Sequence, residues 1–213
     1  MKNEIQYNQT ITVATLTRDE VINPQDLRLM RYSKLDETHE GIPTGKLGNQ
    51  AGGFPFELNG KVWKGTEYLY LCGKWSWEGD EARTIQEDVR SAASNYAAKR
   101  FKDNKYRRRT RADWETIRVP YMLWCVWRKC LGNSDYRALL LSLPEDRVVV
   151  EVISRDPFWA AVEGEDGIIR GKNIMGKIIT ICRRCLQQGT TPEIDTDLLN
   201  QAGIYLLGER VEF

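Results

Sequence analysis

Apolar and polar residues recur along the chain with two different periods, which together predict a protein that mixes helices and strands. Apolar residues three and four positions apart predict one amphipathic helix around 85–96 and another over 173–188. The apolar run 147–153 predicts a buried strand, and the β-branched stretch 11–17 predicts an edge strand. Shorter segments complete the prediction: helices from Glu67, from Trp114 to Leu131, over 135–143 and near 197–201, a strand over 204–207, and loops over 36–53 and 164–171.

Residues that favour helix ends or breaks agree with these segments. Gly65 and Thr66 offer an N-cap for the helix that begins at Glu67. Pro120 is expected to kink or restart the helix in which it lies. No internal repeat or linker composition interrupts the pattern. We therefore expect an α+β, predominantly helical fold: one compact domain over 28–188, an N-terminal extension over 1–27 and a C-terminal extension over 189–213.

The composition narrows the class of protein. Of 213 residues, 41% are hydrophobic and 29% are charged, which excludes disordered and collagen-like chains. No apolar run approaches the roughly 18–20 residues that a membrane span requires. The first six residues are not followed by the apolar core of a secretion signal. Five cysteines at these spacings do not form a disulfide framework. We expect a cytoplasmic protein with free thiols.

The charge of the chain is distributed unevenly. The net charge is +1, but the segment from Lys99 to Arg111 alone carries +7, so the rest of the chain carries −6. A positive segment on an otherwise acidic protein favours an anionic partner, either a phosphorylated ligand or the nucleic-acid backbone. Arg107, Arg108 and Arg109 are its candidate contacts. The alternative is a solvated helix end with no specific partner.

Several common catalytic and binding sites find no support. His39 is the only histidine and lies in a polar loop, so Ser-His-Asp and Cys-His catalysis lack a base unless His39 supplies it. Cys182 and Cys185 have the spacing of half a zinc site, but the helical pattern places both on the apolar face, as in a protein core. Neither a phosphate-binding loop nor a dinucleotide fingerprint occurs. We expect neither a metal site nor a bound cofactor.

Acids, aromatic residues and a glycine-rich loop remain as candidates. Glu67 opens a helix, where the helix dipole favours a carboxylate, and Asp156 directly follows the predicted buried strand. Both patterns also occur in ordinary helix starts and turns. Trp63, Trp114 and Trp159 could stack on a nucleobase or pack in the core. The segment from Arg170 to Asn173 ends a glycine-rich loop, opens a helix and is a candidate phosphate cradle.

Taken in order, these pieces resemble the NADAR family of YbiA-like N-glycosidases. The resemblance covers about residues 28–188, and its ordered elements together are specific although each alone is weak. The elements are Arg31-Tyr32-Ser33, Gly48-Asn49, Phe54 to Tyr68, Gly73-Lys74-Trp75, Asp113-Trp114-Glu115, Leu139 to Leu141 with Val150-Glu151, Asp156-Pro157-Phe158-Trp159, and Gly171 to Gly176.

The resemblance implies hydrolysis of an N-glycosidic bond at a phosphorylated ribose. The substrate classes that it implies are ADP-ribose on a base such as guanine, in DNA or in a NAD-derived nucleotide, or ribosylaminopyrimidine phosphates of the riboflavin pathway. Such reactions pass through an oxocarbenium-like sugar that a carboxylate stabilises. By resemblance, the catalytic residues are Glu67 and Asp156, and the substrate-binding residues are Asn49, Phe54, Tyr68, Lys74, Trp114, Trp159, Lys172 and Asn173.

This chain also departs from the family pattern. Tyr68 replaces the histidine that usually follows the catalytic glutamate, the usual Ser-Asn-Phe loop is Gly48 to Gly53, and Ala160 replaces a glycine. These changes surround the base-binding end of the expected site, so they leave the substrate open. They also leave two other classes open: a protein that binds an ADP-ribose-like nucleotide without cutting it, and a nucleic-acid-binding protein that uses residues 99–111.

Overall fold

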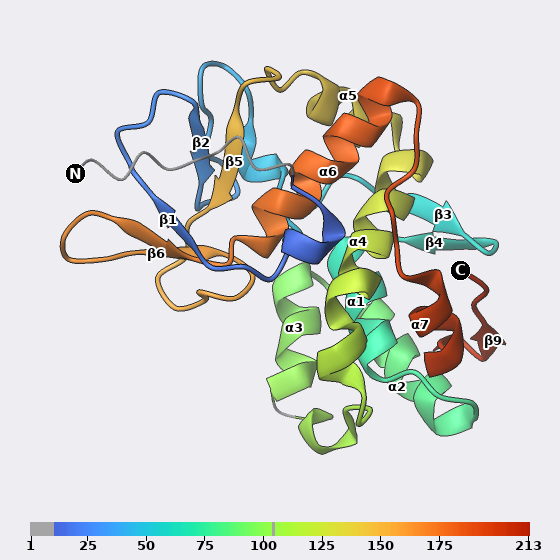
Figure 1. Ribbon diagram of the computed structural model, residues 1–213. Coiled ribbons are helices and arrows are strands. Elements are labelled where there is room, and N and C mark those ends of the chain that lie inside the picture. The colour runs from blue at the N-terminus through green and yellow to red at the C-terminus, as the bar shows by residue number, and fades with distance from the viewer. Residues whose placement is uncertain (1–10, 104) are drawn as a thin grey trace. The chain divides into compact units, whose positions relative to one another are not determined.

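The computed structural model describes residues 11–103 and 105–213, except for the side chains of 101–103. The chain folds into two compact units, each made of two separate stretches of sequence (Figure 1). The first unit contains the described residues up to Gly48 together with Asp135–Glu193, and the second contains the described residues of Asn49–Ser134 together with Ile194–Phe213. Helices and strands are both present, so the expected α+β class is confirmed.

The first unit is built around short strands and one long helix. β2 (Leu29–Tyr32) pairs in parallel with β5 (Val148–Glu151), and β7 (Ile169–Gly171) lies between β1 (Glu20–Ile22) and β6 (Ala161–Glu163). An isolated bridge links Val152 to Ala161. The apolar core of these strands consists of Ile22, Leu29, Val150, Val152, Ala161 and Ile169. The unit also contains η1 (Val13–Thr15), η2 (Thr44–Lys46), most of α5 (Ser134–Leu141) and α6 (Ile174–Gln188).

The helix α6 packs directly on β5. Asn173 opens α6 with left-handed backbone angles of φ 48° and ψ 40°. Its carboxamide accepts a hydrogen bond from the Glu151 N–H at 3.1 Å and donates one to the Val149 carbonyl at 3.0 Å. Gly176 allows the close approach, because a Cβ there would lie 2.2 Å from the Val149 oxygen. Cys182 and Cys185 are buried on this helix, as predicted.

The prediction of an edge strand over 11–17 is wrong. Residues 13–15 form the 3-10 helix η1, and the first strand begins at Glu20. Thr15 folds the segment back on itself, because its hydroxyl accepts from the Thr12 N–H at 2.9 Å and donates to the Thr12 carbonyl at 3.0 Å. The buried ammonium of Lys177 then binds the carbonyls of Leu16 and Arg18. These carbonyls are therefore held by a side chain rather than by a neighbouring strand.

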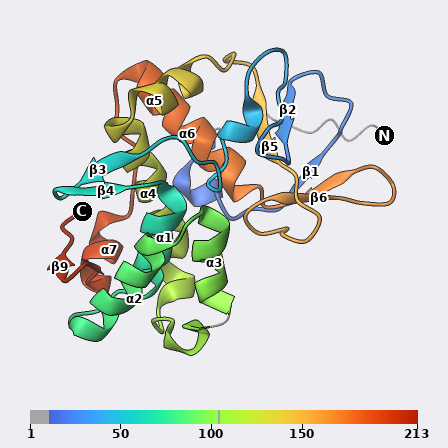
Figure 2. The same ribbon diagram turned by 180° about the vertical axis from the view of Figure 1, so that it is seen from behind.

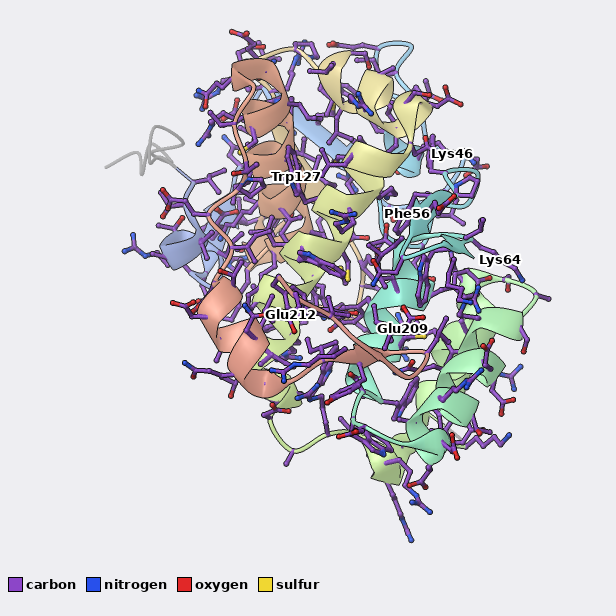
Figure 3. All side chains as sticks on the ribbon, turned by 90° about the vertical axis from the view of Figure 1, so that its right-hand side faces the viewer. Lys46, Phe56, Lys64, Trp127, Glu209 and Glu212 are labelled. Carbon is purple, nitrogen blue, oxygen red and sulfur yellow. The ribbon has the colours of Figure 1, made fainter. Side chains whose placement is uncertain are left out.

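The second unit is mainly helical, with α1 (Thr66–Lys74) packed against three other helices. These are α2 (Asp80–Ser91), α3 (Asn95–Asp103) and α4 (Trp114–Gly132); the view from behind shows α3 beside α1 (Figure 2). The hairpin of β3 (Phe56–Leu58) and β4 (Lys61–Trp63) leads into α1. Figure 3 labels Phe56 on this hairpin and Trp127 on α4. The short η3 (Arg107–Arg109) precedes α4.

The single helix expected around 85–96 is wrong, because it is divided into α2 and α3. Ala92 ends α2 with extended backbone angles of φ −54° and ψ 141°. The Ala92 carbonyl accepts hydrogen bonds from Lys64 Nζ and from the Tyr68 hydroxyl, both at 3.2 Å. As a result Tyr96 is 71% exposed rather than buried. Pro120, in contrast, does not interrupt its helix, because α4 runs through it from Trp114 to Gly132.

The segment after Ile194 is an integral part of the second unit. It forms α7 (Thr196–Ala202) and a hairpin of β8 (Tyr205–Leu206) with β9 (Glu209–Arg210), close to the predicted helix and strand. Gln86 of α2 donates to the Tyr205 carbonyl at 2.8 Å and accepts from the Leu207 N–H at 2.5 Å. Likewise, β1 lies within the expected N-terminal extension but pairs with β7. The domain boundaries at 27/28 and 188/189 stay predictions.

Candidate active site

Glu67 is a buried carboxylate in the first turn of α1, with only 6% of its surface exposed. Its Oε2 atom accepts a hydrogen bond from Nδ2 of Asn49, which is itself 6% exposed. The structure thus brings together two of the residues that the sequence singled out. A hydrogen bond to a carboxylate favours its charged form and fixes its orientation, so Asn49 positions the Glu67 carboxylate.

The first turn of α1 adds a favourable field for this carboxylate. The helix follows Gly65, whose φ of 173° is extended, and no side chain caps the helix at that residue. Backbone N–H groups at a helix N-terminus carry a partial positive charge, which stabilises an anion beside them. The expected N-cap is therefore confirmed at Gly65, and the helix begins one residue earlier than predicted, at Thr66.

Buried aromatic rings lie on the same helix as Glu67. The ring of Tyr70, one turn along α1, lies 4.9 Å from that of Trp114, and the ring of Tyr121 is 6.2 Å from Trp114. Burial raises the pKa of Tyr70 well above its ordinary value; the Glu67 charge raises it further, whereas Arg118 lowers it. Tyr70 therefore stays a neutral phenol at physiological pH. Trp114 is 4% exposed and packs in the core here, one of the two roles considered for it.

The other candidates of this unit lie on α1 itself or just before β3. Tyr68 is 3% exposed and donates its hydroxyl to Ala92, and burial raises the pKa of that phenol. Lys74 lies in the last turn of α1, where its ammonium is 5.9 Å from the centre of the Trp75 ring. Phe54 is half-buried just before β3. The binding roles of these three residues stay predictions.

Asp156 and Trp159 belong to the first unit, in the turn that follows β5. Oδ1 of Asp156 accepts hydrogen bonds from the N–H groups of Phe158 at 3.2 Å and Trp159 at 2.9 Å. Among the described residues, Oδ2 of this half-buried carboxylate has no hydrogen-bond partner. The half-buried Trp159 ring packs edge-on against Phe158, with the ring centres 5.2 Å apart. The turn thus holds one acidic oxygen and one aromatic ring in fixed positions.

Lys172 and Asn173, the expected phosphate cradle, are engaged within their own unit. The Lys172 ammonium donates to the Thr17 carbonyl at 2.8 Å and pairs with Asp19 at 3.2 Å. Asn173 is 1% exposed, and both ends of its carboxamide bind the backbone of β5. These contacts join α6 to the rest of the unit, and a role in binding a ligand stays a prediction for both residues.

A cavity of about 260 Å³ also lies in the first unit, beside α6 and β5. Lys177 and Arg183 are its most buried cations. Lys177 donates to the backbone near η1, and Arg183 donates to the carbonyls of Pro144, Glu145 and Arg147. Because these cations already bind the chain itself, we assign no ligand to the cavity.

The basic segment is partly neutralised by acidic neighbours in the second unit. Arg109 pairs with Glu81, and Lys105 pairs with Asp88 at 2.6 Å. Hydrogen bonds from Lys105 and Tyr106 lower the pKa of Asp88. Arg107 and Arg108 are exposed and form no ion pair with a described side chain. The side chains of Lys102 and Asp103 lie outside the described residues.

Thiol chemistry plays no visible part in the site. All five cysteines are free and buried. Burial raises the pKa of Cys72 and of Cys125 above the ordinary range, which leaves both as unreactive thiols. Over the described part of the chain, no helix combines the length and the apolar character that crossing a bilayer requires.

Comparison with known proteins places these residues in a family. The profile of the NADAR domain matches residues 33–187, which is well over half of the chain. The chain belongs to the NADAR family. Glu67, Asn49 and Asp156 all lie inside the matched range, as do Trp159, Lys172 and Asn173. Membership of the NADAR family indicates glycosidase-type chemistry in general terms.

A solved NADAR-type structure supports the same fold. The chain is similar to the NMR structure of the Escherichia coli protein YbiA, with a TM-score of 0.58 and 24% sequence identity. The similarity covers 76% of this chain and 86% of YbiA. At this level of identity it establishes the YbiA-like fold alone. No curated protein matches the chain.

The sequence did not single out every residue around Glu67. Tyr70 lies three positions after Glu67, so helical spacing could have found it. Asn95, which is 8% exposed at the start of α3, carries no such signal. Its position beside the Asn49 loop depends on a contact across 45 residues of sequence, between its Nδ2 atom and the Gln50 carbonyl.

Proposed function

We propose that this NADAR protein is an N-glycosidase that hydrolyses the bond between C1′ of a phosphorylated ribose and a base nitrogen. The proposed substrate carries an ADP-ribosyl group on a nucleobase such as guanine, free or in DNA. The observation that carries the proposal is the buried Glu67 carboxylate, which Asn49 orients at the N-terminus of α1. Enzymes that hydrolyse glycosidic bonds at a sugar C1′ commonly use a fixed carboxylate to stabilise the oxocarbenium-like transition state.

In this mechanism, Glu67 acts at the C1′ side of the sugar. As the bond between C1′ and the base breaks, the negative charge of Glu67 stabilises the oxocarbenium-like sugar. The Glu67 carboxylate then acts either as the nucleophile at C1′ or as the general base that activates water. Water supplies a hydroxyl group to C1′, and the departing base takes the remaining proton. The buried aromatic rings beside Glu67 exclude bulk water, which strengthens the attraction between the carboxylate and the developing positive charge.

Asp156 has a positioning role in the proposal. Its Oδ1 atom is held by two backbone N–H groups, so the second oxygen is fixed in direction. A carboxylate oxygen with no other partner suits a ribose hydroxyl or a base N–H group. Trp159 would provide a flat surface for the base.

The test is a panel of substrates incubated with wild type and Glu67→Gln. The panel contains ADP-ribosylated guanosine, ADP-ribosylated DNA, ribosylaminopyrimidine phosphates and NAD, with free base and sugar phosphate followed by mass spectrometry. Glutamine keeps an oxygen that accepts from Asn49, so the fold should persist while kcat falls about 10³-fold. Glu57→Gln, at an exposed position of β3, is the matched control and should keep wild-type activity.

The outcomes separate the function classes. Release from an ADP-ribosylated substrate that is lost in Glu67→Gln supports the proposal. Release only from ribosylaminopyrimidine phosphates would move the substrate to the riboflavin pathway. Full activity in Glu67→Gln contradicts the assigned role, and tight binding without release would make the protein a nucleotide-binding member of its family.

A further inference from the structure

Three buried polar atoms near the start of α1 form no hydrogen bond with any described residue. They are the carboxamide oxygens of Asn49 and Asn95 and the hydroxyl of Thr66. Asn49, Asn95 and Thr66 are 6%, 8% and 1% exposed, respectively. An unsatisfied buried acceptor is costly, and the large majority of such atoms in native proteins have a partner. Their grouping around one helix turn therefore indicates a missing donor.

The two asparagines are anchored through their nitrogens, which leaves both oxygens for another partner. Asn49 Nδ2 binds Glu67, and Asn95 Nδ2 donates to the carbonyl of Gln50 at 2.7 Å. Asn95 is thus tied to the residue next to Asn49. These hydrogen bonds also decide which atom of each carboxamide is the oxygen, because only an N–H group can donate to an oxygen.

Gly65 brings the Asn95 oxygen close to the start of α1. A Cβ at this glycine would lie 3.5 Å from Asn95 Oδ1, in ordinary van der Waals contact. The extended φ of 173° at Gly65 is accessible to any residue, so backbone strain does not explain the glycine. The same Cβ would lie 3.7 Å from Asn95 Nδ2, so the Asn95 carboxamide lies beside the start of α1, two residues before Glu67.

The chemistry of this group selects its ligand. The two unpaired carboxamide oxygens, of Asn49 and Asn95, are hydrogen-bond acceptors, so they require a group that donates. An ionised phosphate oxygen supplies none, whereas each hydroxyl of a ribose supplies one. We propose that Asn95 is a further substrate-binding residue. Its carboxamide oxygen accepts a hydrogen bond from a hydroxyl group of the ribose whose N-glycosidic bond is hydrolysed. This inference rests on the proposed function and assigns Asn95 to the part of the proposed site that binds the sugar.

The experiment pairs a side-chain deletion with a hydroxyl deletion. Binding of ADP-ribose is measured by calorimetry for wild type and Asn95→Leu, and repeated with ADP-ribose lacking the 2-hydroxyl or the 3-hydroxyl of its terminal ribose. We expect Asn95→Leu to weaken ADP-ribose binding about 10-fold. One deoxy ligand should bind wild type and variant with equal affinity, because the group that Asn95 contacts is already gone.

Two further variants keep the test informative if Asn95→Leu folds poorly. Asn133→Leu is the matched control, because Asn133 Nδ2 likewise donates to a loop carbonyl, that of Pro55 at 2.8 Å. It should bind ADP-ribose as wild type does. Gly65→Ala places a methyl group against the Asn95 oxygen without straining the backbone. It should fold normally and bind ADP-ribose as weakly as Asn95→Leu.

The outcomes distinguish this inference from the proposed function, because calorimetry requires no turnover. If substrates are hydrolysed but Asn95→Leu and Gly65→Ala bind ADP-ribose as wild type does, the Asn95 inference is overturned and a water fills the site. If Asn95→Leu lowers the affinity for both deoxy ligands by the same factor as the affinity for ADP-ribose, Asn95 acts only on the fold. If wild type binds no ADP-ribose, the inference and the ADP-ribosyl substrate class both fail.

Discussion

Lys177 on α6 places an ammonium group in the interior of the first unit, with its side chain 3% exposed. Its charge is balanced by Glu20 of β1 at 3.3 Å. Burial lowers the pKa of Lys177 and raises the pKa of Glu20, and the attraction between the two charges opposes both shifts. The pair joins α6 to β1 at the cost of removing two charges from water.

Replacing this lysine should produce a pH-dependent loss of stability. In Lys177→Met, Glu20 loses its cation, so its already raised pKa rises further. The folded state then binds a proton more readily than the unfolded state, whose Glu20 has the ordinary value of 4.5. Stability therefore falls as pH rises above 4.5. We expect the loss relative to wild type to reach about 2 kcal/mol at pH 7 and to be smaller at pH 4.5.

Urea unfolding at the two pH values measures this effect. Lys172→Met is the control. The Lys172 ammonium also binds a backbone carbonyl and a carboxylate, but that carboxylate belongs to Asp19, which is exposed. The control should lose little stability, and this loss should not increase between pH 4.5 and pH 7. An equal loss for Lys177→Met at both pH values would contradict the coupling to Glu20.

At the residue scale, the sequence reveals those groups whose signal is local. Glu67 is visible because it opens a helix after a turn, and Asp156 because it follows a buried strand. Asn95 and Lys177 are not visible, because their partners lie 45 residues away, at Gln50, and more than 150 residues away, at Leu16 and Arg18. Spacing along a chain does not report such contacts.

At the scale of elements, the contact of α6 with β5 depends on a missing side chain. A Cβ at Gly176 would lie 2.2 Å from the Val149 carbonyl and 2.5 Å from Asn173 Oδ1. Neither group can yield easily, since the first is strand backbone and the second is held by β5. An alanine there would force the helix away from the strand.

Gly176→Ala should therefore destabilise the protein by roughly 3 kcal/mol, at the upper end of the usual cost of adding a methyl group to a packed core. Thermal or urea unfolding measures the change. Gly52→Ala is the control, because a Cβ at Gly52 meets nothing within 4 Å. If Gly176→Ala unfolds like wild type, α6 does not require this close approach.

Elements with strong periodicity were predicted well, and those that depend on one polar contact were not. The strand at 147–153 and the helix over 173–188 appear as β5 and α6 because both bury continuous apolar faces. The expected strand at 11–17 failed because side chains satisfy its carbonyls. The expected helix at 85–96 failed because Tyr68 and Lys64 bind the carbonyl at its break.

At the scale of the whole molecule, the uneven charge predicts how a nucleic-acid substrate would bind. A triple variant with alanine at Arg107, Arg108 and Arg109 should raise KM for an ADP-ribosylated DNA strand and leave KM for ADP-ribosylated guanosine unchanged. The slope of log affinity against log salt should fall by about 2, as expected when three phosphate contacts to a single strand are lost. Unchanged DNA affinity and slope in the variant would show that these arginines contact no nucleic acid.

The two units are interleaved along the chain, and this has a consequence for synthesis. The first stretch of the first unit ends at Gly48, but its second stretch begins only at Asp135. In the second unit, which contains Glu67, the Gln86 side chain forms hydrogen bonds with the backbone of residues 205 and 207. On the ribosome, α1, which carries Glu67, therefore emerges long before the C-terminal part of its unit exists. A nascent chain halted before residue 205 would contain both Glu67 and Asp156 and still lack the hydrogen bonds that complete the unit of Glu67.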